Sequence, residues 1–165
     1  MSTVNDYIGR TVDISALQGQ QVTQTESGRP LRETLALQGQ HGLVITGIIK
    51  LAQRWTLELL TERGTIQYEP SRGTFFYTFA RLGFFRTVLE AEQQFYSALI
   101  DVRRNLVAEE TGIEPDDERY AGTQLLGIAL VPDLLTIRAR VNSLAGTSRE
   151  VILPISTTVG GVGSS

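Results

Sequence analysis

The chain contains no cysteine, one histidine and one lysine among its 165 residues. Without cysteine there is no disulfide framework, no thiolate metal site and no cysteine nucleophile. His41 is the only histidine, so the sequence pattern predicts neither a histidine metal site nor a Ser-His-Asp triad. The simplest environment is a reducing compartment, and a particle assembled in the cytoplasm and then released fits it equally well.

Long apolar runs and positive charge are also scarce. The longest apolar stretch, residues 42–60, is interrupted by charged side chains, so it is not expected to span a membrane. The first six residues lack the charged and apolar regions of a signal peptide. A net charge of -3 argues against a nucleic-acid coat, because phosphate binding requires clustered positive charge.

The glycine patterns that bind nucleotides are missing as well. The sequence contains neither a G-x-x-x-x-G-K-[ST] phosphate loop nor a G-x-G-x-x-G turn. We therefore expect no catalytic residue, no metal and no cofactor. What remains is a chain of one domain's length with an ordinary hydrophobic content of 41%.

Two segments have the 3.6-residue periodicity of amphipathic helices. The first covers residues 43–63, with an apolar stripe on one side and charged side chains, including Glu58, on the other. Gly64 follows it, where a left-handed C-terminal cap belongs. The second begins at a capping box formed by Thr87 and Glu90 and extends over about 36 Å to residue 110.

The pattern changes to a period of two after an acidic loop, residues 114–118, which we expect to be solvated. Alternation of apolar and polar residues predicts strands over residues 122–131, 136–142 and 149–155. The fold class is α+β, with two long helices packed on a small C-terminal antiparallel sheet.

The expected organisation has three parts. Residues 1–42 form an irregular N-terminal arm with one or more short strands, such as residues 11–17. Residues 43–155 form the α+β domain. Residues 156–165 form a Gly/Ser-rich tail that we expect to be flexible.

The segment between the predicted helices has the composition of a structural joint. Gly64, Arg72 and Gly73 fix the backbone path, and five of the six phenylalanines then follow within residues 75–85. These rings either form the core between the helices or present an interface patch, with alternate rings serving both roles. Arg72 either pairs with a carboxylate of a neighbouring subunit or is a solvated turn residue.

This order of elements resembles the baseplate-wedge family of contractile phage tails, the "lysozyme-like" sheath initiators. The resemblance spans residues 43–155 in element order, but the motifs cover only about fifteen residues. It is carried by a Leu-Leu-Thr-x-x-Gly signature and a Pro-x-x-Gly turn, here Leu59, Leu60, Thr61, Arg63, Gly64, Pro70, Arg72 and Gly73. The family's Glu-Pro-Arg motif has Glu114-Pro115-Asp116 as its nearest counterpart, with the arginine displaced to Arg119.

The resemblance implies a non-enzymatic virion protein assembled in the host cytoplasm. Its expected partners are other baseplate wedge and hub proteins and the tail tube and sheath subunits, in multiple copies per particle, without nucleic acid or membrane. The C-terminal strands would pair with the first ring of sheath by strand addition. The predicted joint and contact residues are Gly64, Arg72, Gly73, Phe75, Phe76, Phe79, Arg138, Arg140, Val151 and Leu153.

Two alternatives remain open at this point. A connector in a non-contractile tail is the alternative within the same class. A peptidoglycan-cleaving glycosidase is the alternative from a different class, because Glu109, Glu110 and the acidic loop contain the paired carboxylates which that chemistry needs. Such an enzyme also requires one carboxyl with a raised pKa.

Overall fold

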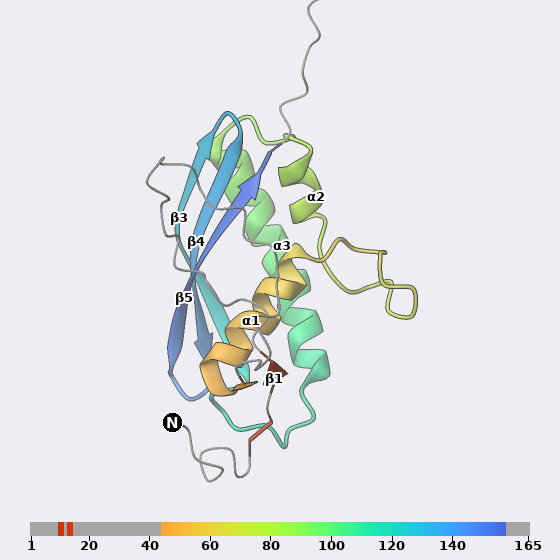
Figure 1. Ribbon diagram of the computed structural model, residues 1–165, viewed down its shortest axis with the longest axis vertical. Helices are drawn as coiled ribbons and strands as arrows, with labels where there is room; N and C mark the ends of the chain where they lie inside the picture. The colour runs from red at the N-terminus through yellow and green to blue at the C-terminus, as the bar shows by residue number, and fades with distance from the viewer. Residues whose placement is uncertain (1–9, 12, 15–43, 158–165) are drawn as a thin grey trace, which may run out of the picture.

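A computed structural model describes residues 10–11, 13–14 and 44–157. Its elements in chain order are β1 (Asp13–Ile14), β2 (Val44–Ile45), α1 (Gly47–Leu60), α2 (Phe76–Arg81), α3 (Val88–Glu109), β3 (Tyr120–Val131), β4 (Leu134–Ser143) and β5 (Ser148–Ser156). The described part has two layers, a twisted sheet and a layer of helices on one face of that sheet (Figure 1). This mixed architecture agrees with the predicted α+β class.

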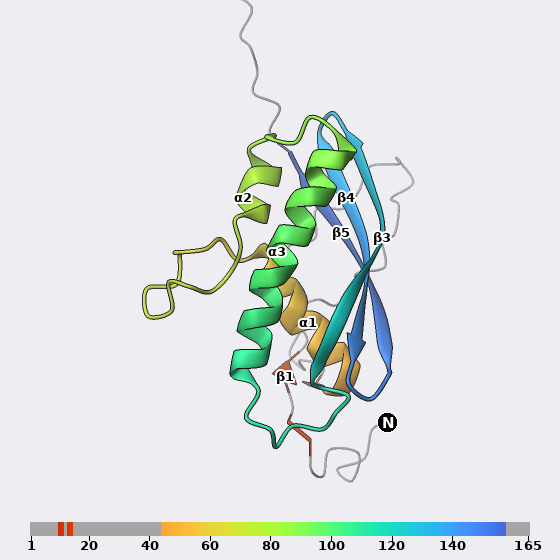
Figure 2. The same cartoon turned by 180° about the vertical axis from the view of Figure 1, so that it is seen from behind.

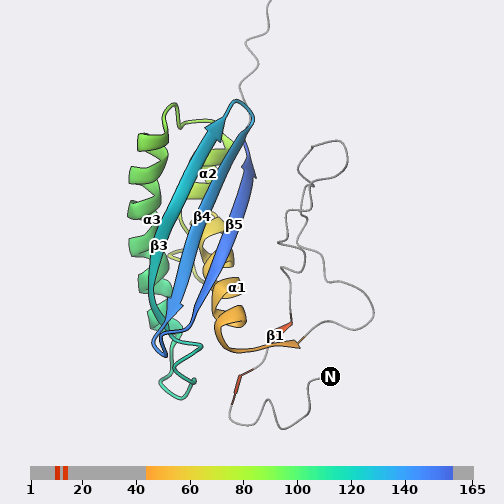
Figure 3. The ribbon, with the colours of Figure 1, turned by 90° about the vertical axis from the view of Figure 1, so that its left-hand side faces the viewer.

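The main sheet is an antiparallel meander in the order β3-β4-β5. A two-residue turn, Pro132-Asp133, joins β3 to β4, and a turn with Gly146 at φ +78° joins β4 to β5. The predicted C-terminal sheet is therefore confirmed. In Figure 3 the sheet stands in front of the helices, so the viewer faces the side that the described helices leave uncovered.

Alternation along the strands determines which side chains face the helices. On β4, Ile137, Ala139 and Val141 are fully buried, whereas Arg138 and Arg140 are exposed, as the period of two predicts. Facing residues of β5 complete this buried row, which packs on an aromatic centre formed by α1, α2, α3 and the segment between α2 and α3. The centre consists of Trp55, Phe76, Phe85 and Phe95.

The helices differ from the prediction of two long ones. Only α3, with 22 residues, is long; α1 has 14 residues, and a third helix of six residues, α2, forms within the phenylalanine cluster (Figure 2). The predicted start of the first helix was wrong because residues 44–45 pair with residues 13–14 as β-strands. Its end was placed too late because Thr61 is extended, with φ -74° and ψ 126°.

The start of α3 was predicted correctly. The Thr87 hydroxyl accepts a hydrogen bond from the Glu90 N–H, and the Glu90 carboxylate accepts from the Thr87 N–H. Residues 65–68, between α1 and α2, form bends and turns. Of the predicted N-terminal arm, residues 1–9, 12 and 15–42 lie outside the described part, as do residue 43 and residues 158–165 of the predicted tail.

Candidate functional site

A loop of fifteen residues, 61–75, connects α1 to α2 and projects from the body of the protein (Figure 1). Its base is closed by a parallel bridge between Glu62 and Thr74, with Arg63 N–H donating to the Thr74 carbonyl at 3.1 Å. Tyr68, within the loop, is 90% exposed. A compact loop whose ends lie close together is a common carrier of function.

The base of this loop is held by a buried carboxylate on α1. Glu58 is 2% exposed, and its Oε1 accepts from the Gly73 N–H at 2.7 Å and from Asn105 Nδ2 at 2.5 Å. Its Oε2 accepts from Arg72 Nη2 at 2.8 Å and from Arg72 Nε at 3.1 Å. One carboxylate thus joins α1, the loop and α3, because a buried charge requires a partner for each of its oxygens.

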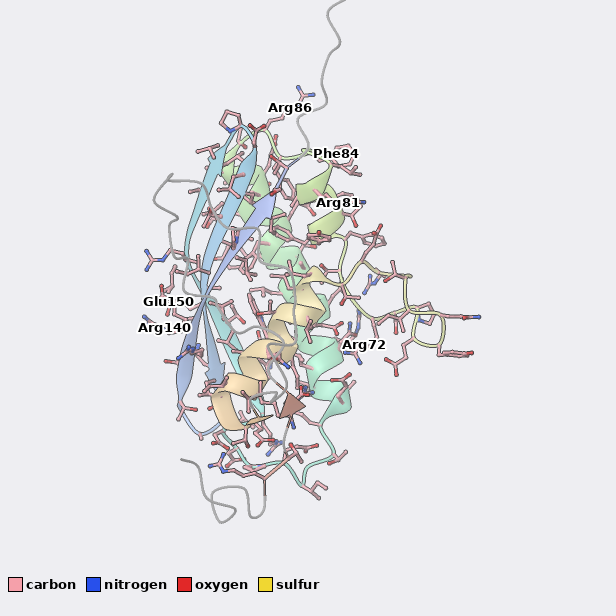
Figure 4. All side chains as sticks on the ribbon, in the orientation of Figure 1. Arg72, Arg81, Phe84, Arg86, Arg140 and Glu150 are labelled. Atoms are coloured by element: carbon pink, nitrogen blue, oxygen red, sulfur yellow. The ribbon has the colours of Figure 1, made fainter. Side chains whose placement is uncertain are left out.

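Arg72 extends this cluster to the C-terminal end of α3, as Figure 4 shows. Its guanidinium contacts Glu109, and it also lies 3.2 Å from the carboxylate of the exposed Glu69. Glu109 in turn accepts a hydrogen bond from Arg54 Nη2 at 2.8 Å. Burial opposes the charge on Arg72, but hydrogen bonds and charge from Glu58 and Glu109 outweigh it and raise the pKa of Arg72. Arg72 therefore pairs within its own chain, which neither of the two sequence-based alternatives anticipated.

The two glycines predicted for the joint have different environments. Gly73 has φ +80°, and a Cβ there would lie 2.3 Å from the Thr61 carbonyl oxygen. Gly64 has φ +87° with nothing within 4 Å of that position. Gly64 lies four residues beyond α1 instead of capping it directly. At position 73 glycine is required because a side chain would overlap the Thr61 carbonyl. At position 64 glycine is favoured only because the backbone has a positive φ.

The predicted aromatic residues divide between core and surface. Phe76 is buried, with its ring centroid 5.8 Å from that of Phe95. Phe75 is 48% exposed, stacks on the half-buried Phe79 and lies under the Arg63 guanidinium, 5.6 Å from its ring centroid. Phe76 therefore belongs to the core, whereas Phe75 lies at the surface and its role as an interface residue stays a prediction.

The strand residues divide in the same way. Arg138 and Arg140 lie on the uncovered face of the sheet, where Arg138 Nη2 and Glu150 Oε1 are 2.7 Å apart. Figure 4 shows Arg140 and Glu150 on the side of the sheet away from the helices. Val151 and Leu153 are buried against the helices. Because these side chains lie in the core, Val151 and Leu153 can contact a neighbouring strand only through their backbone groups.

β5 is an edge strand, because no strand among the described residues pairs with its outer side. Two bonds fix the direction of its backbone groups: Thr157 N–H donates to the Asp133 carbonyl at 3.0 Å, and Ser143 N–H donates to the Thr147 carbonyl at 2.9 Å. Successive residues of a strand point their backbone groups to opposite sides. Odd-numbered residues of β5 therefore face β4, and the outward-facing residues are Ser148, Glu150, Ile152, Pro154 and Ser156.

A second buried carboxylate lies at the opposite end of α1. Glu118 is 1% exposed and accepts from Thr46 Oγ1 at 2.6 Å, from the Gly47 N–H at 3.2 Å and from the Thr11 hydroxyl. Lys50 Nζ lies 3.4 Å away. Burial acts to raise the pKa of Glu118, but these hydrogen bonds and the Lys50 charge outweigh it, so the pKa is lowered. Glu118, which lies just before β3, therefore caps the N-terminus of α1.

The acidic loop therefore differs from the solvated segment we expected. Glu118 is buried, while the partly exposed Glu114 accepts hydrogen bonds from the backbone N–H groups of Thr111 and Gly112. Hydrogen bonds from backbone groups, including that of Thr111, lower the pKa of Glu114 to about 2. Both shifts run opposite to the raised pKa that a glycosidase general acid requires. Within the described ranges, no group of three or more His, Cys, Asp or Glu residues forms a metal site.

The sequence did not reveal the structural role of three polar side chains: the buried carboxylates of Glu58 and Glu118 and the amide of Asn105. Glu58 was assigned to the polar side of the first helix, where a charged residue is ordinarily solvated. The only sequence signal was indirect: a glycine after an arginine, fifteen residues beyond Glu58, indicated a tight turn but not its partner.

No family model, curated protein or solved structure matches this chain. In the part of the chain that the structure describes, no helix is long and apolar enough to cross a membrane.

Proposed function

We propose that this protein is a structural subunit of a phage tail baseplate, which links the inner baseplate or tube to the first ring of sheath by protein–protein contact and strand addition. It acts without catalysis or cofactor and is present in several copies within the virion, after assembly in the host cytoplasm. Its partners are baseplate wedge and hub proteins and the tube and sheath subunits.

The observation that carries the proposal is the open edge of β5. Its outward residues from Ser148 to Ile152 offer both N–H and C=O groups, which is what an added strand requires. Pro154 lacks an N–H and interrupts the row, as edge strands commonly do to limit uncontrolled pairing. An added strand would therefore pair with the part of β5 that precedes Pro154.

The projecting loop supplies a second argument. Together with Leu59 and Leu60 at the end of α1, it contains the Leu-Leu-Thr-x-x-Gly and Pro-x-x-Gly residues on which the resemblance to baseplate-wedge proteins depends, and Glu58 holds its base. Anchoring of this kind reduces the entropy that the loop loses on binding a partner. It suits a subunit whose task is to hold neighbours in fixed positions.

The test uses a single edge substitution. Deleting the C-terminal residues from Arg149 onward would remove Val151, Leu153 and Ile155 from the core and unfold the protein. Ile152→Pro instead removes one outward N–H and leaves the β4-facing bonds of its odd-numbered neighbours in place. We expect the purified variant to keep its circular-dichroism spectrum, and phage carrying it to assemble tail tubes that lack sheath.

Ile152→Val is the matched control, because it keeps the N–H, and its tails should have normal sheath content. Normal sheath on the Ile152→Pro particles would contradict strand addition at β5. Wild-type particles that contain the protein but have no sheath would identify a connector of a non-contractile tail. Clearing of a peptidoglycan suspension by the purified protein, abolished by Glu114→Gln, would instead establish a glycosidase.

A further inference from the structure

Helix α3 has an apolar stripe on the side that faces away from the core. The core side is formed by Ala91, Phe95, Ala98, Val102 and Leu106, all buried. The other side exposes four large apolar side chains, with exposed fractions of 62%, 49%, 69% and 46%, at Leu89, Tyr96, Ile100 and Val107. A helix of a monomeric protein ordinarily presents polar residues there.

These four residues follow the spacing of a coiled-coil seam. Together with Gln93 and Arg103, both exposed, they occupy positions 89, 93, 96, 100, 103 and 107, in alternating steps of four and three. This is the a/d repeat by which one helix packs against another. We call these six residues the α3 seam.

The seam is also symmetric about its own centre. Leu89 and Val107, Gln93 and Arg103, and Tyr96 and Ile100 are each centred on residue 98. A two-fold axis perpendicular to α3 at that height would place each member of a pair opposite its counterpart on a second copy. Such an interface is isologous: when one residue contacts another across it, the reverse contact also exists.

We propose that α3 is the docking surface for a second copy of this chain, with the two α3 helices antiparallel and the two-fold axis near residue 98. Three kinds of layer then form: Leu89 against Val107, Gln93 against Arg103, and Tyr96 against Ile100. Every large apolar residue of the seam meets an apolar partner.

Charge selects the antiparallel arrangement. In it, Arg103 meets the Gln93 side chain, whose carbonyl oxygen accepts its hydrogen bonds, and Arg104 lies across from Glu90 at the flank of the seam. A parallel pair would instead bring two Arg103 side chains together inside the seam, where like charges repel strongly. The macrodipoles of the two helices also align favourably only in the antiparallel pair.

The length of the seam sets the strength of the association. From residue 89 to residue 107 the helix rises by eighteen steps, about 27 Å, which corresponds to an interface near the lower end of specific ones, about 1,000–1,200 Å² in total. We therefore expect a reversible dimer with a dissociation constant on the order of 10 μM. This surface is separate from the β5 edge, so the dimer does not depend on the proposed function.

Cross-linking tests the orientation directly, because the chain has no cysteine of its own. Leu89→Cys and Val107→Cys are prepared separately in the full-length protein and oxidised alone and as an equimolar mixture. The proposal predicts that a disulfide-linked dimer forms in the mixture and hardly at all with either variant alone. Dimers formed by each variant alone would indicate a parallel pair and overturn the proposal.

Sedimentation velocity over a concentration series tests the association itself. We expect wild type to shift from monomer to dimer, and Ile100→Glu to stay monomeric, because the carboxylate would face Tyr96 of the second copy. Ile49→Glu is the matched control: Ile49 is also an exposed helical isoleucine, on α1, and its substitution should leave the dimer unchanged. A wild-type protein that remains monomeric throughout would overturn the proposal.

Gln93→Glu should strengthen the dimer, whereas Ile100→Glu should abolish it. In the antiparallel pair it creates an ion pair with Arg103 of the second copy at two symmetric positions, so we expect the dissociation constant to fall about tenfold. A parallel pair would face two glutamates against each other and weaken. A dissociation constant that rises in Gln93→Glu would therefore rule out the assigned geometry.

Discussion

Oε1 of Glu58 on α1 lies 2.5 Å from Nδ2 of Asn105 on α3, and both residues are buried. This hydrogen bond links the two helices through residues that are 47 positions apart in sequence. The same oxygen accepts from the Gly73 N–H, so one buried atom connects both helices to the base of the projecting loop. The helical core thus positions this base together with the bridge between Glu62 and Thr74.

Glu58→Ala should be strongly destabilising. It leaves the Asn105 amide and the Gly73 N–H without their buried acceptor and removes the main partner of Arg72. We expect a loss of about 3 kcal/mol in the free energy of unfolding, measured by urea titration. Glu69→Ala is the control, because Glu69 also contacts Arg72 but is exposed, and it should cost less than about 1 kcal/mol. Equal costs for the two variants would show that the buried contacts do not matter.

Gly73→Ala and Gly64→Ala separate steric overlap from backbone strain. Both positions have positive φ, which costs a residue with a side chain about 1–2 kcal/mol. At Gly73 the added Cβ also overlaps the Thr61 carbonyl, so we expect about 3 kcal/mol or more in total. Thermal unfolding of the two variants measures the difference, and a Gly64→Ala variant that is as unstable as Gly73→Ala would refute this account.

Phe76→Ala and Phe75→Ala test the division of the aromatic cluster. Phe76 is buried in the core, so its truncation should cost about 3–5 kcal/mol. Phe75 is half-exposed and loses chiefly its contact with the Arg63 guanidinium, so about 1 kcal/mol is expected. Chemical denaturation of both variants gives the two values, and similar losses would mean that Phe75 is also a core residue.

The parts of the fold that depend on local pattern could be predicted from the sequence. The alternation of Ile137, Ala139 and Val141 with arginines predicts β4 and its buried side, and Thr87 with Glu90 predicts the start of α3. These signals are contained within one turn or one strand. They require no knowledge of what lies across the core.

The parts that depend on distant partners could not be predicted. The first helix begins at Gly47, later than its periodicity indicates, because residues 44–45 pair with a segment more than thirty residues earlier. Glu58 and Glu118 are charged residues of a type ordinarily found at the surface. They are buried only because hydrogen-bond donors from distant segments surround them. Nothing in the local sequence distinguishes such carboxylates from solvated ones.

The buried cap at Glu118 makes a prediction about acid stability. Its pKa is lowered in the folded protein from the ordinary value of 4.5, so between these two values the unfolded chain binds more protons than the folded one. The contribution of Glu118 is therefore fully present above about pH 4.5 and is lost as the pH falls through the folded pKa. We expect Glu118→Gln to be less stable than wild type at neutral pH, with the difference shrinking as the solution becomes more acidic.

Urea unfolding at a series of pH values measures that difference. Glu114, whose pKa is also lowered, to about 2, is present in both proteins, so its contribution cancels when the two curves are subtracted. The variant Glu114→Gln is the companion measurement, and its own difference from wild type should decline between pH 4.5 and about 2. A stability difference for Glu118→Gln that stays constant or grows on acidification would mean that the carboxylate is not held charged at the start of α1.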